Sequence, residues 1–276
     1  MSVIYSGQTI TNTIVSGASQ TGLNSALKDA LLGVGWSVIK DGSSDNIWRL
    51  RSGTTPQGNS GDLWLWTGTL FSQPVCIFAA SSSLCTGNTQ YGTSGGPQLQ
   101  TPTPLGTNSG FGAGVNYQLF ANPYWFFLCR TITPCPSGQS YFFSVPYVTP
   151  NLTGLISSIN VAMGSNSSSL TLGRLTFAGE NYAWGYLNGQ GQSSGSFHLH
   201  GWTSSAAPTW FDQSREFYEP RIIVTPVGGA AAACGFQWDM LIHNSPVPRN
   251  TTISYDGSTW LVITESIDPA LWVKIG

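Results

Sequence analysis

Charged side chains are scarce in this chain. Asp, Glu, Lys and Arg make up 8% of its 276 residues, against roughly 25% in ordinary soluble domains. The 10 basic and 12 acidic residues leave a formal net charge of -2, and the basic ones are scattered singly from Lys28 to Lys274. Proteins that bind the phosphates of nucleic acids have basic residues clustered in a patch or stripe. The composition therefore predicts that nucleic acid is not a partner.

Long apolar runs are also missing. No stretch reaches the roughly 18 apolar residues of a membrane span, and residues 1–10 have neither the basic nor the apolar region of a signal peptide. We therefore expect no membrane partner, and synthesis in the cytoplasm without a cleaved signal.

The five cysteines show no metal-binding spacing. They are Cys76, Cys85, Cys129, Cys135 and Cys234, and none forms the CxxC or Cys/His pattern of a zinc site. Two close pairs, Cys76 with Cys85 and Cys129 with Cys135, could each close a short hairpin in an oxidising environment. In a protein made in the cytoplasm, buried thiols that pack as small apolar side chains are the favoured interpretation.

Aromatic residues are plentiful, with 11 Trp, 13 Phe and 10 Tyr. Together with the sparse charge they suggest surfaces that partner subunits cover, because a solvent-exposed surface normally carries more charge. The alternative is a compact β protein in which all the aromatic rings belong to the core.

The hydrophobic pattern predicts a mainly β chain with one short helix. Apolar residues recur at three and four over residues 21–32 and Gly33 supplies a stop, so we expect an amphipathic helix there. Short runs rich in aromatic and β-branched residues predict strands at 36–40, 47–51, 63–66, 75–80, 117–120, 124–130, 141–145, 170–177, 182–187, 196–200, 221–225, 235–243, 251–255, 260–264 and 271–275. Asp256-Gly257 is a two-residue hairpin signal. The fold class expected is an antiparallel sheet or sandwich with an N-terminal helix.

Two segments interrupt this pattern. Residues 86–116 are rich in Gly, Ser, Thr, Pro, Gln and Asn and exceed a typical connection, which predicts either disorder or an arm that lies on a neighbour. The pattern also weakens around 146–168, so we expect two regions, 1–150 with the helix and the arm, and 151–276 as a sandwich-like β region.

Candidate catalytic groups are few. Asp212, Glu216 and Glu219 have the spacing of one helical face, and paired carboxylates can hydrolyse glycosides; with Arg215 and Arg221 between and beside them, the same spacing describes a neutralised surface turn. GxSxG occurs by letter at 92–96 and 191–195, but neither copy lies between an expected strand and an expected helix, as a nucleophile elbow requires. No phosphate-binding loop is present. We therefore predict no enzymatic activity and no cofactor.

Two pairs of residues are candidates for binding. His198 and His200 lie two apart on an expected strand, so they share one face and could hold a metal, alone or around a symmetry axis; the alternative is a pair of polar strand residues. Trp64 and Trp66 share a face in the same way and could stack on sugar rings, whereas the uninterrupted apolar run at 63–66 favours two core residues.

Several stretches resemble proteins from the structural modules of tailed bacteriophages. These stretches are Ala26–Trp36, Tyr117–Leu128, Val145–Tyr147, Asp256–Trp260 and Leu271–Val273. Such proteins occur in tail tips, baseplates and necks, and the pattern carries no catalytic residues. The resemblance implies a virion protein whose partners are copies of itself and other virion proteins. A carbohydrate- or receptor-binding module of the same particle, with a host glycan as partner, and a glycoside hydrolase are the alternatives.

Overall fold

The structure is a computed structural model. It describes residues 3–44, 46–66, 69–70, 73–74, 114, 116–131, 140–150, 156–164, 171–177, 180–184, 196–200, 217–225, 232–243, 247–263 and 270–276. Within these ranges the protein is mainly β, with several antiparallel sheets and one short helix, as expected from the sequence.

The helix α1 (Gln20–Gly33) forms where its periodicity predicts. Ser19 caps its start, with the Ser19 hydroxyl oxygen accepting a hydrogen bond of 3.0 Å from the Gly22 amide, which satisfies one of the amides that lack a helical partner. Leu23, Leu27 and Leu31, at successive intervals of four, are fully buried. This stripe packs the helix onto the core.

The largest sheet has eleven strands in the order β1-β7-β8-β9-β11-β12-β13-β14-β16-β17-β10. Its members are β1 (Thr11–Val15), β7 (Tyr117–Ala121), β8 (Trp125–Arg130), β9 (Ser140–Ser144), β10 (Tyr147–Val148), β11 (Ile156–Gly164), β12 (Thr171–Phe177), β13 (Glu180–Trp184), β14 (Ser196–His200), β16 (Arg221–Thr225) and β17 (Ala232–Phe236). All neighbours pair antiparallel except β13 and β14. One sheet thus contains strands from both sides of residue 150, and the division into two regions stays a prediction.

Three smaller sheets complete the described structure. One contains β2 (Ser37–Lys40), β3 (Ile47–Arg51) and β4 (Asp62–Trp66), and another is the pair β5 (Thr69–Leu70) and β6 (Gln73–Pro74). The third has the order β15-β18-β21-β20-β19 and is built from β15 (Phe217–Tyr218), β18 (Met240–His243), β19 (Thr252–Tyr255), β20 (Ser258–Val262) and β21 (Ala270–Lys274).

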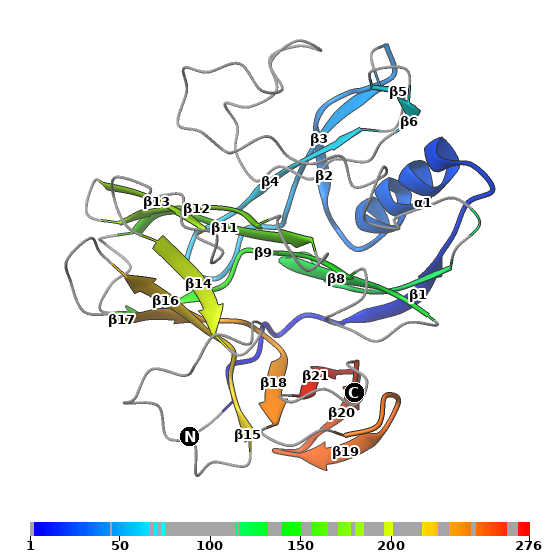
Figure 1. Ribbon diagram of the computed structural model, residues 1–276. Coiled ribbons are helices and arrows are strands. Elements are labelled where there is room, and N and C mark those ends of the chain that lie inside the picture. Colours follow the sequence, from blue (N-terminus) through cyan, green and yellow to red (C-terminus); the bar gives the residue numbers. More distant parts are fainter. Residues whose placement is uncertain are drawn as a thin grey trace.

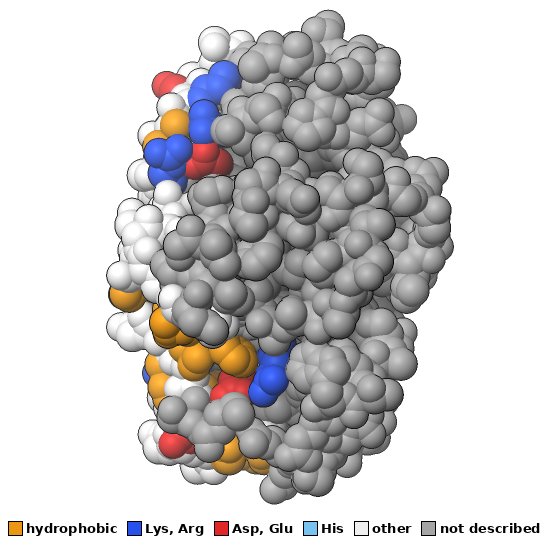
Figure 2. All heavy atoms as spheres, turned by 90° about the vertical axis from the view of Figure 1, so that its left-hand side faces the viewer, with side chains coloured by type: hydrophobic (Ala, Val, Ile, Leu, Met, Phe, Trp, Pro, Cys, Tyr) orange, Lys and Arg blue, Asp and Glu red, His pale blue; other side chains and the backbone are white. Residues whose placement is uncertain are grey.

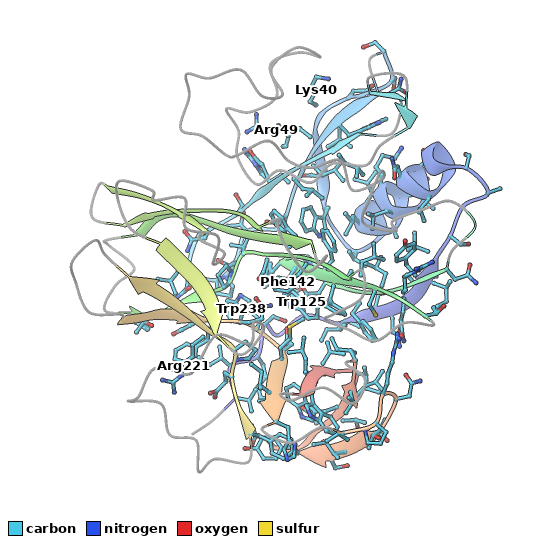
Figure 3. The ribbon with its side chains drawn as sticks, viewed as in Figure 1. Lys40, Arg49, Trp125, Phe142, Arg221 and Trp238 are labelled. Atoms are coloured by element: carbon cyan, nitrogen blue, oxygen red, sulfur yellow. The ribbon has the colours of Figure 1, made fainter. Side chains whose placement is uncertain are left out.

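These parts form three layers (Figure 1). The helix and the β2–β4 sheet lie on one side of the large sheet, and the C-terminal five-stranded sheet lies on the other. One core cluster joins α1 and the β2–β4 sheet to β7, β8 and β9, while a second lies within the C-terminal sheet and includes Val3 from the N-terminal segment. In Figure 3, Trp125, Phe142 and Trp238 lie in the interior, while Lys40 and Arg49 lie at one end of the molecule.

Many of the described aromatic rings lie in the core. The nine largest fully buried side chains are all aromatic, among them Trp125, Trp260 and Trp272. The large hydrophobic side chains that are exposed in the described residues are aliphatic. The described aromatic residues therefore contribute mainly to core packing, and the expectation that partner subunits cover the sparsely charged surface stays a prediction.

The strand predictions differ from the structure in two ways, a break within one predicted strand and several strands that were not predicted. The run at 235–243 is not one strand, because a turn at 237–239 separates β17 from β18 and sends them into different sheets. Six strands of the structure were not predicted, namely β1, β5, β6, β10, β11 and β15; of these, β10 and β11 lie in the 146–168 stretch where the sequence pattern weakens. The expected strand at 75–80 lies outside the described residues.

The hairpin between β19 and β20 allows a test of turn chemistry. Asp256 and Gly257 have φ values of 50° and 73°, the left-handed conformations that a type I′ turn requires at both central positions. A Cβ on Gly257 would meet nothing within 4 Å, so Gly257→Ala should cost only the backbone preference, about 1 kcal/mol of unfolding free energy in urea titrations. Gly33→Ala, also in open space but at the end of a helix, should cost nothing. Equal stability of the two variants would contradict the turn assignment.

Candidate functional site

A buried polar network surrounds Asp239, which lies in the turn between β17 and β18. One carboxylate oxygen accepts a hydrogen bond from the Ser6 amide at 3.0 Å, and the other accepts from the Asn122 side chain and the Trp125 indole, both at 3.3 Å. Asp239 and Asn122 are fully buried. The Asn122 side-chain oxygen in turn accepts from the amides of Tyr124 and Trp125. Every member of this network has a partner, as buried polar groups require.

The network holds the N-terminal segment between two layers. The Asp239 amide donates to the Ile4 carbonyl oxygen, and the Gln8 side chain donates to the Tyr124 hydroxyl. The Tyr5 hydroxyl reaches the Asp256 carboxylate at 3.0 Å. Residues 3–8 therefore contact both the β7–β8 turn and the C-terminal sheet, and they help to join the two.

Burial governs the ionisation of Asp239. Loss of solvent raises the pKa of this carboxyl group above its ordinary value, although hydrogen bonds from Ser6 and Trp125 and the positive charge of Lys274 oppose the shift. A buried acid with a raised pKa is often catalytic. Here both carboxylate oxygens accept hydrogen bonds from the protein's own groups and the residue is inaccessible, so the geometry indicates a structural role.

A second bridge to the C-terminal sheet is made by Arg249, which precedes β19. Its guanidinium group donates to the Arg130 carbonyl oxygen at 2.9 Å, to the Gln118 side chain and to the Cys129 sulfur. Cys129 is buried and outside any disulfide, so it agrees with the predicted thiol. Cys76, Cys85 and Cys135, and the side chain of Cys234, lie outside the described residues.

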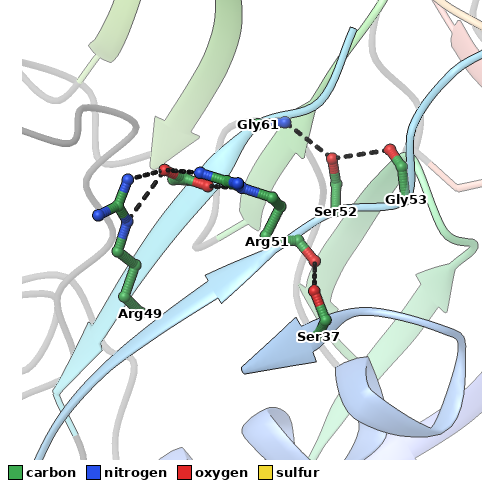
Figure 4. Close-up of polar contacts among 7 residues, drawn as sticks. Ser37, Arg49, Arg51, Ser52, Gly53 and Gly61 are labelled. Atoms are coloured by element: carbon green, nitrogen blue, oxygen red, sulfur yellow. Dashed lines mark hydrogen bonds and ion pairs between the residues drawn. The ribbon is translucent and has the colours of Figure 1, made fainter. Parts of the chain in front are cut away.

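The β2–β4 sheet carries the clearest charged cluster (Figure 4). The Asp62 carboxylate accepts hydrogen bonds from the guanidinium groups of both Arg49 and Arg51, the latter at 2.7 Å. Burial by itself would raise the pKa of Asp62, but the hydrogen bonds and charges of the two arginines outweigh it and lower this pKa. In Figure 2, basic side chains gather around an acidic one near the top of the molecule.

The tryptophan pair belongs to this same sheet. Leu63 and Leu65 of β4 are fully buried in the core, so strand alternation puts the positions of Trp64 and Trp66 on the other face, together with Asp62. In the register Trp64 lies opposite Arg49. The side chains of both tryptophans lie outside the described part, and neither the binding nor the core interpretation is tested.

The histidine pair has a defined register. His198 and His200 lie in β14, opposite Ile223 and Arg221 of β16, as the expected strand requires. Their side chains lie outside the described part, so metal binding stays a prediction. In the residues that the structure does describe, no group of three or more His, Cys, Asp or Glu could hold a metal.

Of the three acidic residues Asp212, Glu216 and Glu219, the structure describes only Glu219. Glu219 is buried and lies between β15 and β16, so it is not on a helix and the helical face expected for three acids is wrong at this residue. Asp212, Glu216 and Arg215 lie outside the described residues, as do both GxSxG matches.

The two edges of the large sheet differ, a feature that the sequence did not reveal. At one edge, β10 is two residues long, and the Gln57 side chain binds both backbone groups of Val148, donating to its oxygen and accepting from its amide at 2.7 Å. At the other edge, β1 exposes Ile14 by 55%. Figure 1 shows β1 at the border of the sheet away from β14, β16 and β17.

Comparison with known proteins identified no relative of this chain. The chain matches no protein-family model and no curated protein. Within the described ranges, no helix is long and apolar enough to cross a membrane.

The two carboxyl groups predict opposite effects of pH on stability. A raised pKa means that folded Asp239 holds its proton more tightly than the unfolded chain, so the unfolding free energy should fall as pH rises from about 4 through the raised pKa. Asp239→Asn should abolish this fall in urea titrations at a series of pH values. Asp62 should stabilise the fold above about pH 4 and lose that effect as pH falls through its lowered pKa, and Asp62→Asn is the matched control. A slope unchanged by Asp239→Asn would exclude this role.

Proposed function

We propose that the chain is a non-enzymatic structural subunit of a tailed-phage virion, in a tail, baseplate or neck, and that it acts through contacts with copies of itself and with other virion proteins. The observation that carries the proposal is the location of its exposed apolar side chains. Ile14 lies on β1, and Val38 and Ile39 lie on β2, each at the edge of a sheet. Exposed apolar edge strands are sites at which another chain can add a strand.

The polar interior supports the same interpretation. Asp239 and Asn122 bind other parts of the chain, and Arg249 links two layers. These groups are used to hold segments together. A subunit that transmits force or fixes geometry needs such ties, and its contacts need no catalytic residues.

The virion assignment rests on the phage-like stretches of the sequence and on the sparse charge. Sparse charge fits a protein whose surface is shared with neighbours, since an isolated soluble protein depends on charge to avoid association.

Density-gradient centrifugation tests this assignment. Particles purified from lysates of cells that carry the gene should contain the chain, detected by mass spectrometry, in the particle band and in a fixed ratio to the major virion proteins. Its presence only in the soluble fraction would overturn the virion assignment.

A second candidate function is glycan binding by the face of the β2–β4 sheet that bears Asp62. The specific observation is that Trp64 and Trp66 occupy positions on the face opposite the buried Leu63 and Leu65. Aromatic rings beside fixed polar groups are a common platform for sugars.

Glycan-array binding, followed by calorimetry on any hit, tests this second function. Trp64→Ala and Trp66→Ala should each weaken a genuine hit by about tenfold, since a ring contact contributes on the order of 1 kcal/mol. Ile39→Ala, on strand β2 at the opposite edge of the same sheet, should leave the affinity unchanged. An array without hits would exclude glycan binding for the glycans it displays.

A further inference from the structure

We infer that strand β1 is a self-association edge, through which two copies of this chain join their large sheets by antiparallel β1–β1 pairing. The inference deepens the proposed function, because it names one partner and the surface that contacts it. The inference depends on the structure of β1 and its surroundings. It could therefore be correct even if the virion assignment were wrong.

The first argument is that β1 lacks the features that protect other edges. Proteins shield edge strands with short length, charge, proline or bulges. Strand β10 has two residues and its Val148 backbone is engaged by Gln57. Strand β2 exposes Val38 and Ile39, but it also carries Lys40 and has an irregular register between Val38 and Lys40. Strand β1 pairs with β7 in an unbroken register, and its sequence TNTIV has neither charge nor proline.

The exposure of β1 is the second argument. Thr11, Asn12 and Ile14 are exposed, and Ile14, at 55%, has the highest exposure among the large hydrophobic side chains of the described residues. Asn12 and Ile14 point to the same face. By contrast β19, an edge of the C-terminal sheet, exposes no large apolar side chain.

The third argument identifies a second copy as the occupant. Residues 10–14 read Ile-Thr-Asn-Thr-Ile and are the same in both directions. Two such segments, antiparallel and centred on Asn12, would set each Ile10 opposite an Ile14, and each Thr11 opposite a Thr13. The two Asn12 residues would face each other across the two-fold axis. An interface of this kind contacts the same residues on both copies, as a symmetric dimer requires.

This pairing brings like residues together without a charge conflict. Thr pairs and β-branched pairs are favourable directly across antiparallel strands. Asn12 already accepts a hydrogen bond of 3.1 Å from the Gln118 side chain, so its side chain is oriented before a partner arrives. The pairing surface is short, so we expect a weak dimer with a dissociation constant on the order of 10–100 µM. Weak contacts of this size become effective when other contacts hold the copies close.

Sedimentation velocity of the purified chain from about 1 to 300 µM tests the inference. The wild-type chain should shift from monomer to dimer, and Ile14→Lys should raise the dissociation constant by at least about tenfold, because lysine protects edge strands. Val38→Lys places the same charge on the exposed edge strand β2 and should leave the dimer intact. A wild-type monomer at about 300 µM, or equal loss of the dimer in both variants, would overturn the inference.

Cysteine cross-linking tests the register. Under oxidation Asn12→Cys should form a disulfide-linked dimer well above the wild-type background, because directly opposite residues bring their Cβ atoms to roughly 4.5–5.5 Å. Thr13→Cys should cross-link much less. Efficient cross-linking of Thr13→Cys with none of Asn12→Cys would overturn the pairing centred on Asn12.

The two proposals fail in different ways. If the chain is found in virions but is monomeric in solution, the virion assignment stands and β1 pairing is wrong. If the chain forms a dimer of the predicted register but is absent from virions, β1 pairing stands and the virion assignment is wrong.

Discussion

The buried carboxylate of Asp239 is the contact on which the described architecture most depends. It is the point where the N-terminal segment, the β7–β8 turn and the β17–β18 turn meet, through Ser6, Asn122 and Trp125. These three parts are more than one hundred residues apart in sequence. A buried acceptor whose donors come from distant segments makes docking of the layers cooperative. If one donor is removed, the buried carboxylate lacks a hydrogen bond, which also weakens the contacts of the remaining segments.

Charged residues are scarce in this chain, at 8% of the sequence. Some of the few charged side chains fix local geometry, as in the pairing of Asp62 with Arg49 and Arg51. The remaining surface is polar but weakly charged. Neighbours can approach it with little electrostatic penalty, so association depends on shape and on backbone pairing more than on charge steering.

The sequence predicted the helix and most of the longer strands, but it missed six strands and did not predict how the strands assemble into sheets. Helix α1 followed from its apolar periodicity, and the β19–β20 hairpin followed from Asp256-Gly257, because both signals lie within a few residues. The break at Gln237–Asp239 was missed, since it is set by hydrogen bonds to Ser6 and Asn122, far away in sequence. Strand β1 was missed because its alternation of Thr, Asn and Ile gives only a weak apolar signal, although the palindrome at 10–14 was visible. The candidate binding residues were placed on strands correctly, but their side-chain environments depend on tertiary packing.

The Gln57 side chain has a consequence for how far any assembly of these sheets can grow. The Gln57 side chain occupies both backbone hydrogen-bonding groups of Val148 in β10, the strand at the edge of the large sheet opposite β1. A fibril needs two open borders on every unit, one to accept and one to offer. Because both backbone groups of Val148 are occupied, no further strand can pair with β10 through them. Pairing through β1 alone would therefore join two copies of the chain without extending the sheet into a fibril.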